Sequence, residues 1–491
     1  MKNLFSFLSL LLLYSCVASK NFHPQKKYAP QQLQDDYELF RDILEESHPS
    51  LYWYTPKDSV DYYFDWGAQQ LHDSLNEYKF RNVLSYVLAK IHCGHTTARS
   101  SKAATDYAER TRTISFPLNV KAWEDTVVVV QNLNRKDSAI TRGAIIKSID
   151  GRPIQMIVDS LFQYISADGF NTTHKYQTIS NPGAFRSLYA AVFGLRTRTP
   201  VEFIDTMGVK KTTTVNLYIP FIDTTRGKLP SPEKAPSKKM RRSMMLQYTR
   251  NMRVDTSLHT AFMELNSFSK NYHLKGFFKS SFKQMRKEHI PNLVIDLRGN
   301  GGGSVTLSNL LTKYIADKPF RIADSLYAVS NKSRYRHYIT NYFLDRLFFI
   351  FMTRKRKDGY YHFRYFENRY FPPKKKNHFS GTTYVLTGGN TFSAAALVAQ
   401  ALRDQKDVVV VGEETGGGSY GNTAWLIPDV ILPNTHVRFR LPLFRLVIDR
   451  NKPRGRGIMP EVQVGPTLDG IKRNADVKME TIVHLIQQRE K

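Results

Sequence analysis

The chain has 491 residues, of which 41% are hydrophobic, and a formal net charge of +28 at pH 7. This length predicts two or three domains, and the apolar and aromatic content excludes a disordered chain. The positive charges are spread over several loops and no nucleic-acid-binding motif accompanies them. We therefore expect a generally basic surface and no nucleic-acid partner.

The first sixteen residues predict export. Lys2 precedes an apolar run from Leu4 to Leu13, which is too short to span a bilayer as a stable helix. Ser15 stands directly before Cys16, as in a bacterial lipoprotein signal, where the cysteine is lipidated and becomes the mature N-terminus. An ordinary secretory peptide is the alternative. We favour an exported protein held in the cell envelope by a lipid on Cys16, on the outer membrane or facing the periplasm.

A helical domain is expected next. From Gln31 to Lys90 apolar residues recur at helical spacing, which predicts three amphipathic helices. We expect Gly94 to end the last of them in a left-handed conformation, so that His95 lies in a loop. His92, Cys93 and His95 match no usual zinc spacing, and the sequence predicts neither a metal site nor a cofactor.

Short β-like runs dominate the sequence from Phe116 to Pro220. One of them, from Ala144 to Ile149, leads into the Asp150-Gly151 turn and a new apolar segment. This phrase resembles a strand and turn of PDZ domains, which bind peptide ends by adding a strand to their sheet. The alternative is a hairpin of any small β-barrel.

A parallel α/β unit follows a basic, polar stretch. The strand Ala261–Leu265, the basic helix Phe277–Lys287 and the buried strand Asn292–Asp296 form a β-α-β pattern. A glycine loop, 299–303, follows the second strand. It lacks the signatures of a phosphate-binding P-loop or a dinucleotide-binding turn. Its expected role is to present backbone N–H groups to an oxyanion.

Ser393 stands at a second strand-to-helix junction. The apolar run Tyr384–Leu386 predicts a buried strand, Gly388 begins a turn, and good helix formers run on from Ala394. A serine there is exposed beside the free N–H groups of a helix N-terminus, as an acyl-transfer nucleophile requires. Helix capping is the alternative reading of the same serine.

An aromatic and basic insert, 331–378, interrupts this domain. Within it, the apolar run Phe343–Met352 is followed by four basic residues, Arg354–Lys357. A membrane-contacting flap is one interpretation. We favour a lid whose aromatic side chains pack on the catalytic domain.

Four phrases in order resemble the tail-specific, or C-terminal-processing, serine peptidases and their tricorn-core relatives. They are Asp296 to Gly302, Thr391 to Ala394, Gly412 to Gly417, and Gly457 to Glu461. The resemblance extends over most of the chain and includes the helical start of the exported bacterial members. It implies a crotonase-like α/β fold with an N-terminal helical domain and a PDZ-like β-rich domain.

The resemblance also implies roles for single residues. Ser393 takes the position of the nucleophile, and the N–H groups of Ala394 and Gly302 that of the oxyanion hole. Members with a serine–lysine pair carry the lysine where this chain has Gly418. The tricorn-like branch instead uses a histidine from an early phrase that His95 matches, which makes His95 the expected general base.

The acid that orients the histidine is less well defined by the resemblance. That branch places it just before the late phrase, where this chain has Arg454, Gly455 and Arg456. Asp449, Glu413 and Glu414 are the candidates that remain. This departure leaves open a catalytically degenerate, peptide-binding scaffold, and the basic charge leaves open an envelope adhesin.

The sequence therefore predicts a serine-type endopeptidase that cleaves peptides or proteins in the cell envelope through Ser393 and His95. The expected segments are a signal peptide (1–16), a tether (17–30), a helical domain (31–100), a PDZ-like domain (112–222), a basic linker (223–255), a peptidase domain (256–470) and a C-terminal helix (471–491).

Overall fold

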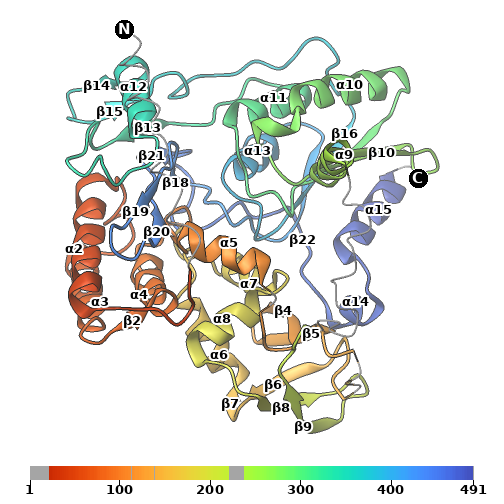
Figure 1. Ribbon diagram of the computed structural model, residues 1–491. Coiled ribbons are helices and arrows are strands. Elements are labelled where there is room, and N and C mark those ends of the chain that lie inside the picture. Colours follow the sequence, from red (N-terminus) through yellow and green to blue (C-terminus); the bar gives the residue numbers. More distant parts are fainter. Residues whose placement is uncertain (1–21, 112, 136, 138, 221–236, 490–491) are drawn as a thin grey trace.

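The computed structural model describes residues 22–111, 113–135, 137, 139–220 and 237–489. The signal peptide with Cys16, the start of the tether and residues 221–236 of the basic linker lie outside the described residues. The chain is a mixed α/β protein with several sheets (Figure 1). Among the described residues, no helix has both the length and the apolar character needed to cross a membrane.

The N-terminal helices follow the predicted spacing. Their apolar faces share one core with strands β19 (Asp429–Ile431) and β20 (Arg438–Arg440), in which Phe40 packs edge-on against Phe439. The end of the predicted tether is part of this structure, because Tyr28 is buried and β1 pairs with β2. The elements are β1 (Lys27–Tyr28), α2 (Pro30–Ser47), α3 (Lys57–Gln69), β2 (Leu75–Asn76), α4 (Glu77–Ala89), β3 (Ala98–Arg99) and α5 (Lys102–Arg110).

The β-rich segment contains an antiparallel sheet in the order β4-β5-β6-β8-β9, with β7 beside β6. Asp150 and Gly151 form the expected turn, both with positive φ. The sequence did not predict the three helices between β7 and β8. The elements are β4 (Leu118–Trp123), β5 (Thr126–Asn132), β6 (Ile145–Ile149), β7 (Arg152–Pro153), α6 (Ile154–Phe162), α7 (Thr172–Ser180), α8 (Ala184–Phe193), β8 (Arg198–Ile204) and β9 (Lys210–Asn216).

One of these helices, α7, lies along the edge strand β4. The N–H of Ala122 donates to Ser180 Oγ (2.9 Å), and Lys121 Nζ donates to Gln177 Oε1 (2.8 Å). A peptide that adds a strand needs the free N–H and C=O groups of a sheet edge. Because α7 takes part of that edge, the structure does not offer β4 as an open strand-addition site.

Two hydrophobic cores flank a six-stranded sheet in the order β10-β11-β12-β16-β17-β22, parallel from β11 onward. Helices α10, α11 and α13 cover one face, and α15 covers the other. Its elements are α9 (Lys238–Thr249), β10 (Arg250–Asp255), β11 (Thr260–Leu265), a 3-10 turn (Lys270–Tyr272), α10 (Leu274–Lys287), β12 (Asn292–Asp296), α11 (Val305–Ile315), β16 (Thr382–Thr387), α13 (Ala394–Arg403), β17 (Val408–Gly412), β22 (Val462–Gln463), α14 (Leu468–Arg473) and α15 (Val477–Arg489).

The aromatic insert belongs to a second sheet, in the order β14-β15-β13-β21-β18. Phe349 stacks on Phe444, and Phe348 packs edge-on against Phe363, as expected of a packed lid. The opposite side of α12 is nevertheless exposed, as shown below. The elements are β13 (Ser325–Ala328), α12 (Tyr342–Met352), β14 (Arg354–Lys355), β15 (Tyr361–His362), β18 (Gly421–Ala424) and β21 (Phe444–Val447).

A three-stranded sheet joins the N-terminal helical domain to the peptidase domain. β19 (Asp429–Ile431) pairs with β20 (Arg438–Arg440), and β20 pairs with β3. Since β3 begins three residues after His95, this pairing ties the His95 loop to the peptidase domain. His92, with φ 56°, holds the left-handed position expected of Gly94. Gly94 is required for space, because a Cβ there would lie 2.5 Å from Phe392 Cζ.

Candidate active site

Ser393 is held in an unusual backbone conformation at the start of α13. Its φ is 52° and its ψ is −124°, and its side chain makes no capping hydrogen bond. A non-glycine residue in this region carries about 1–3 kcal/mol of strain, which the surrounding structure must offset. The capping interpretation of Ser393 is therefore wrong. The hydroxyl is presented at a sharp strand-to-helix turn, as the nucleophile interpretation expects.

The loop that carries Ser393 is tied to both other glycine loops. Phe392 N–H donates to the carbonyl of Asn300 (3.0 Å), and Gly417 N–H donates to the carbonyl of Thr391 (3.1 Å). Thr391 Oγ1 donates to the carbonyl of Leu297 (2.8 Å). These bonds join the carboxyl ends of the parallel strands β12, β16 and β17 into one rigid platform beneath the serine.

Backbone donors surround Ser393, but Gly302 is not a free one. Its N–H donates to Asn300 Oδ1 (2.9 Å), which contradicts its expected role as an oxyanion donor in this conformation. Instead, Gly302 provides space: with φ +101°, a Cβ on it would lie 2.7 Å from Ser393 Cβ. The N–H of Ala394 is at the first position of α13, and those of Gly301 and Gly303 have no acceptor among the described residues.

His95 lies in the same cavity as Ser393. Both line a pocket of about 390 Å³, although the two residues are far apart in the sequence. His95 is 3% exposed, and its ring packs 4.8 Å from that of Phe392. Neither ring nitrogen has a hydrogen-bond partner in the described part of the chain. Hydrogen bonds to a catalytic base are often long in a free enzyme and tighten when substrate binds.

A buried carboxylate that the sequence did not predict stands beside His95. Asp168 Oδ1 lies 3.9 Å from His95 Nδ1 and accepts the N–H of Gly94 at 2.9 Å. Its Oδ2 accepts the N–H of Gly418 at 3.4 Å. Asp168 is 2% exposed and connects the His95 loop with the third glycine loop. It lies on the Nδ1 side of the His95 ring, where an orienting acid would stand.

Burial sets the charge state of this pair. Desolvation, with repulsion from Arg440 and His174, lowers the pKa of His95 to about 3, so its ring is neutral at physiological pH. Desolvation raises the pKa of Asp168 to about 7, although the N–H groups of Gly94 and Gly418 oppose the shift. A neutral imidazole beside a carboxylate that ionises near neutrality is poised for proton transfer.

The three acids expected to orient His95 all have other partners. Glu413 pairs with Lys478 (2.5 Å). Glu414 is buried and accepts from Arg456 Nη2 (2.9 Å) and from the N–H of Gly457 (2.6 Å). The carboxylate of Asp449 accepts the backbone N–H of Asn451, two residues later in the same turn. None makes a hydrogen bond or ion pair with His95, whereas Asp168, in the loop between α6 and α7, lies 3.9 Å from His95 Nδ1.

Cys93 completes a cluster with His95 and Asp168, whose potential ligand atoms lie within 4.8 Å of one another. The sequence spacing gave no reason to expect this cluster. Burial raises the pKa of the Cys93 thiol to about 11, so it remains protonated near neutrality. Its Sγ donates to the carbonyl of Thr423 and accepts from Thr96 Oγ1. These bonds fit a packed thiol, and the histidine and carboxylate fit an acid–base pair.

His174 is a second residue of the site that the sequence did not reveal. It comes from α7, its Nδ1 bonds the carbonyl of Gly389 (2.7 Å), and its ring lies 5.0 Å from that of Phe392. It therefore steadies the turn that leads to Ser393. No local motif marks His174 or Asp168, because both lie in a segment whose dominant signal is β-like. A turn at Asp168-Gly169 is the only sequence signal nearby.

Residues 259–464 match the model of peptidase family S41. Mature CPAF superposes with a TM-score of 0.62 at 16% identity, covering 94% of this chain and 97% of that chain. Mature CPAF complexed with lactacystin superposes with a TM-score of 0.61 at 15% identity, covering 94% of this chain and 98% of that chain. A CPAF serine-to-alanine mutant superposes with a TM-score of 0.64 at 13% identity, covering 94% of this chain and 97% of that chain. At these identities the likeness establishes a shared fold. No curated protein matches the sequence.

Proposed function

Because the chain belongs to peptidase family S41 through residues 259–464 and is a serine-type peptidase, we propose that it is an endopeptidase whose nucleophile is Ser393, general base His95 and orienting acid Asp168. We assign its catalytic domain to the crotonase-like fold and its β-rich segment to a PDZ-like domain. The observation that carries the proposal is the shared pocket of Ser393 and His95, with Asp168 3.9 Å behind the ring.

The proposed reaction follows from these positions. His95 accepts the proton of Ser393 Oγ as the oxygen attacks a peptide carbonyl. Asp168 stabilises the imidazolium that forms. The N–H of Ala394 and that of Gly301 or Gly303 hold the oxyanion. His95 then donates its proton to the leaving amine, and water, activated in the same way, releases the acyl group from Ser393.

Labelling with a fluorophosphonate probe tests this assignment, because the probe reacts with an activated serine and needs no known substrate. We expect the wild type to be labelled and Ser393→Ala to remain unlabelled. His95→Ala should be labelled about 10²–10⁴ times more slowly, the range that a general base contributes. Ser304→Ala, in the neighbouring glycine loop and outside the pocket, is the matched control and should react at the wild-type rate.

The alternative outcome separates the two remaining candidate functions. A folded wild type that is not labelled, and that does not cleave a proteome-derived peptide library, would establish a non-catalytic peptide-binding scaffold. Labelling that persists in Ser393→Ala would place the nucleophile elsewhere. Lactacystin, with which mature CPAF has been solved in complex, serves as a second probe, and we expect it to slow labelling of Ser393.

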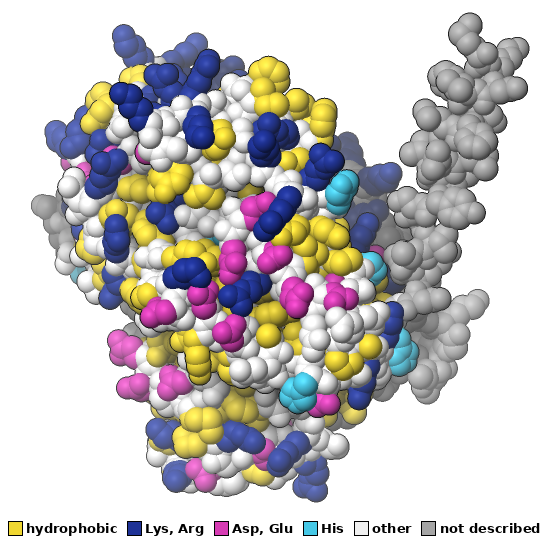
Figure 2. All heavy atoms as spheres, turned by 90° about the vertical axis from the view of Figure 1, so that its left-hand side faces the viewer, with side chains coloured by type: hydrophobic (Ala, Val, Ile, Leu, Met, Phe, Trp, Pro, Cys, Tyr) yellow, Lys and Arg dark blue, Asp and Glu magenta, His cyan; other side chains and the backbone are white. Residues whose placement is uncertain are grey.

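We further propose that the protein works at an anionic membrane surface, held there by a lipid on Cys16. An exposed face of α12 supports this proposal. Its large apolar side chains are 45–77% exposed: Phe343, Leu344, Ile350, Phe351 and Met352. Exposed basic residues, Arg354 to Lys357, follow directly. Figure 2 shows hydrophobic side chains among dense Lys and Arg at the upper end of one face of the molecule. An apolar helix face beside basic residues suits anionic lipid headgroups.

Vesicle co-sedimentation of protein lacking residues 1–16 tests the surface independently of the lipid. We expect binding to vesicles with anionic lipid that weakens with salt and falls in Phe343→Ser/Phe351→Ser. Tyr62→Ser, an exposed aromatic on α3, is the control. Equal binding by both variants, or none by the wild type, would refute this role for α12.

A further inference from the structure

A second and larger cavity adjoins the catalytic pocket. Its volume is about 540 Å³, within the usual range of ligand sites. It lies where the β-rich segment, the peptidase domain and the C-terminal helices meet. Gly299 and Asn390 line both this cavity and the catalytic pocket. The two cavities are therefore neighbours that share part of their walls.

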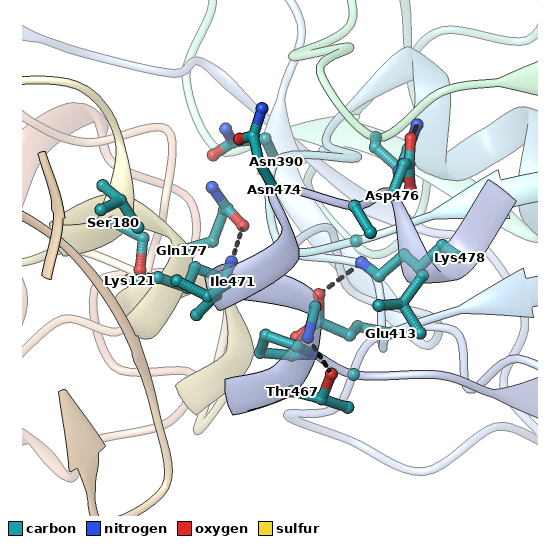
Figure 3. A pocket seen from close by; sticks show the side chains of 18 of the residues that line it. Lys121, Gln177, Ser180, Asn390, Glu413, Thr467, Ile471, Asn474, Asp476 and Lys478 are labelled. Carbon is teal, nitrogen blue, oxygen red and sulfur yellow. Dashed lines mark hydrogen bonds and ion pairs between the residues drawn. The ribbon is translucent and has the colours of Figure 1, made fainter. Parts of the chain in front are cut away.

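Charged side chains gather on the walls of this cavity (Figure 3). Arg298 is neutralised by Asp296 and Asp476, each at 2.6 Å. Lys478 is neutralised by Glu413 at 2.5 Å. These pairs use every carboxylate that lines the cavity, which leaves no internal partner for a further cation.

Lys121 is that further cation. It projects from β4, and its Nζ donates to the uncharged Gln177 Oε1 at 2.8 Å. No carboxylate lies within ion-pair distance of it in the described ranges of the chain. Desolvation, together with the charges of Lys478 and Arg298, lowers the pKa of Lys121 despite the opposing charge of Glu413. Removing an ammonium from water without a counter-charge is unfavourable, and an anionic ligand group offsets that cost.

We infer that Lys121 forms a subsite for an acidic side chain of the peptide substrate, and so selects acidic peptides. This inference rests on the proposed peptidase function. The apolar side chains of Val120, Val130 and Ile471 line the same cavity and suit the aliphatic neighbours of such a group. A carboxylate is preferred to a phosphate because a single unpaired ammonium faces the space, whereas phosphate sites favour bidentate arginine or several donors.

The subsite also lies close to the catalytic loop. A Cβ on Gly388, five residues before Ser393, would lie 3.3 Å from Lys478 Nζ and 3.9 Å from Glu413 Oε2. A carboxylate that enters the cavity therefore meets the charged cluster and the loop of the nucleophile together. Lys121 acts by positioning substrate and takes no part in bond making.

Cleavage of a proteome-derived peptide library by the wild type and Lys121→Met tests the inference. We expect acidic residues to be enriched at a fixed distance from the wild-type cleavage sites, and this enrichment to disappear in Lys121→Met. Lys121→Arg should retain it. Lys210→Met, an exposed lysine on β9 of the same segment, is the matched control and should cleave as the wild type does.

Synthetic peptides taken from that library distinguish the two sources of the carboxylate. Each peptide is compared with its Asn or Gln isostere and with its C-terminal amide. Lys121→Met should raise KM about tenfold for the peptide with the acidic side chain, leave kcat within about twofold, and leave the Asn or Gln isostere unchanged. A KM effect that follows the C-terminal amide instead would overturn the inference. The peptide with the acidic side chain should also lose affinity with rising salt.

Two further results would overturn the inference while sparing the proposed function. One is Ser393-dependent cleavage with no acidic enrichment in the wild type. The other is an equal loss for acidic and neutral peptides in Lys121→Met. Absence of all cleavage by the wild type would instead refute the peptidase proposal. Fluorophosphonate labelling of Lys121→Met at the wild-type rate excludes misfolding as the cause of a change.

Discussion

Asp168→Asn isolates the contribution of the buried acid to catalysis. The substitution keeps the shape of the side chain and removes its charge 3.9 Å from His95 Nδ1. At an effective dielectric constant of about 20, opposite unit charges at this distance attract by about 4 kcal/mol. The attraction exists only when His95 is protonated in the transition state, so we expect kcat/KM to fall about 10³-fold.

The pH dependence of kcat/KM gives a second test of the role of Asp168. His95 has a pKa near 3 and contributes no titration near neutrality. Asp168 has a pKa near 7, and below it the protonated acid cannot stabilise an imidazolium. Wild-type kcat/KM should therefore rise with pH through about 7, and Asp168→Asn should lose this step. The step is an apparent value for the coupled pair.

Stability should change in the opposite direction. Folding raises the pKa of Asp168 from 3.8 to about 7. Between these values the folded state holds a proton that the unfolded state has released, so this group's contribution to stability falls as pH rises, by about 4 kcal/mol in all. Asp168→Asn removes this dependence. Urea unfolding at pH 5 and pH 8 should show about 3 kcal/mol of it in the wild type, the part that falls between pH 5 and the pKa near 7.

Two observations would refute this reasoning. The first is a step near pH 7 that persists in Asp168→Asn, which would assign it to another group. The second is a kcat/KM within about threefold of the wild type, which would remove Asp168 from the mechanism. Wild-type kinetics in Asp449→Asn, whose carboxylate lies in a local turn, provide the matched control.

Three further substitutions test the rest of the site. Gly302→Ala forces a Cβ to within 2.7 Å of Ser393 Cβ at a φ of +101°. Fluorophosphonate labelling of the folded variant should slow at least about 100-fold. Labelling at the wild-type rate would show that the added Cβ does not disturb Ser393. Arg456→Met leaves Glu414 buried without its cation, so the free energy of unfolding in urea should fall by about 2 kcal/mol or more. Labelling of the folded protein should stay normal, and slow labelling would return Glu414 to the candidate catalytic residues. His95→Gln should slow labelling without the pH step, and a step that remains would exclude the His95–Asp168 pair.

Local signals in the sequence were enough for the parts of the site that each belong to one short stretch. Strand–glycine–helix junctions depend on neighbouring residues, so the platform of three glycine loops and the placement of Ser393 follow from the phrases around residues 296, 393 and 412. Helical spacing likewise predicted the N-terminal helices, because it depends on residues three and four apart.

Long-range packing decided the rest. Asp168 reaches His95 from the loop between α6 and α7, and no local pattern in the sequence encodes that approach. Glu413 and Glu414 belong to the third glycine loop in the sequence. In the fold, however, they form ion pairs with Lys478 and Arg456, which come from distant parts of the chain. The cavity around Lys121 exists only where three separate segments meet.

The sequence alone therefore predicted Ser393 and its glycine platform, because these depend on residues close together in the chain, whereas His95 was expected from the family resemblance. Only the tertiary structure decided which acid supports His95, which N–H of the glycine loop is engaged and which lysine lacks a counter-charge. Each of these depends on which groups burial brings within a few ångströms of one another, and that proximity is a property of the folded chain.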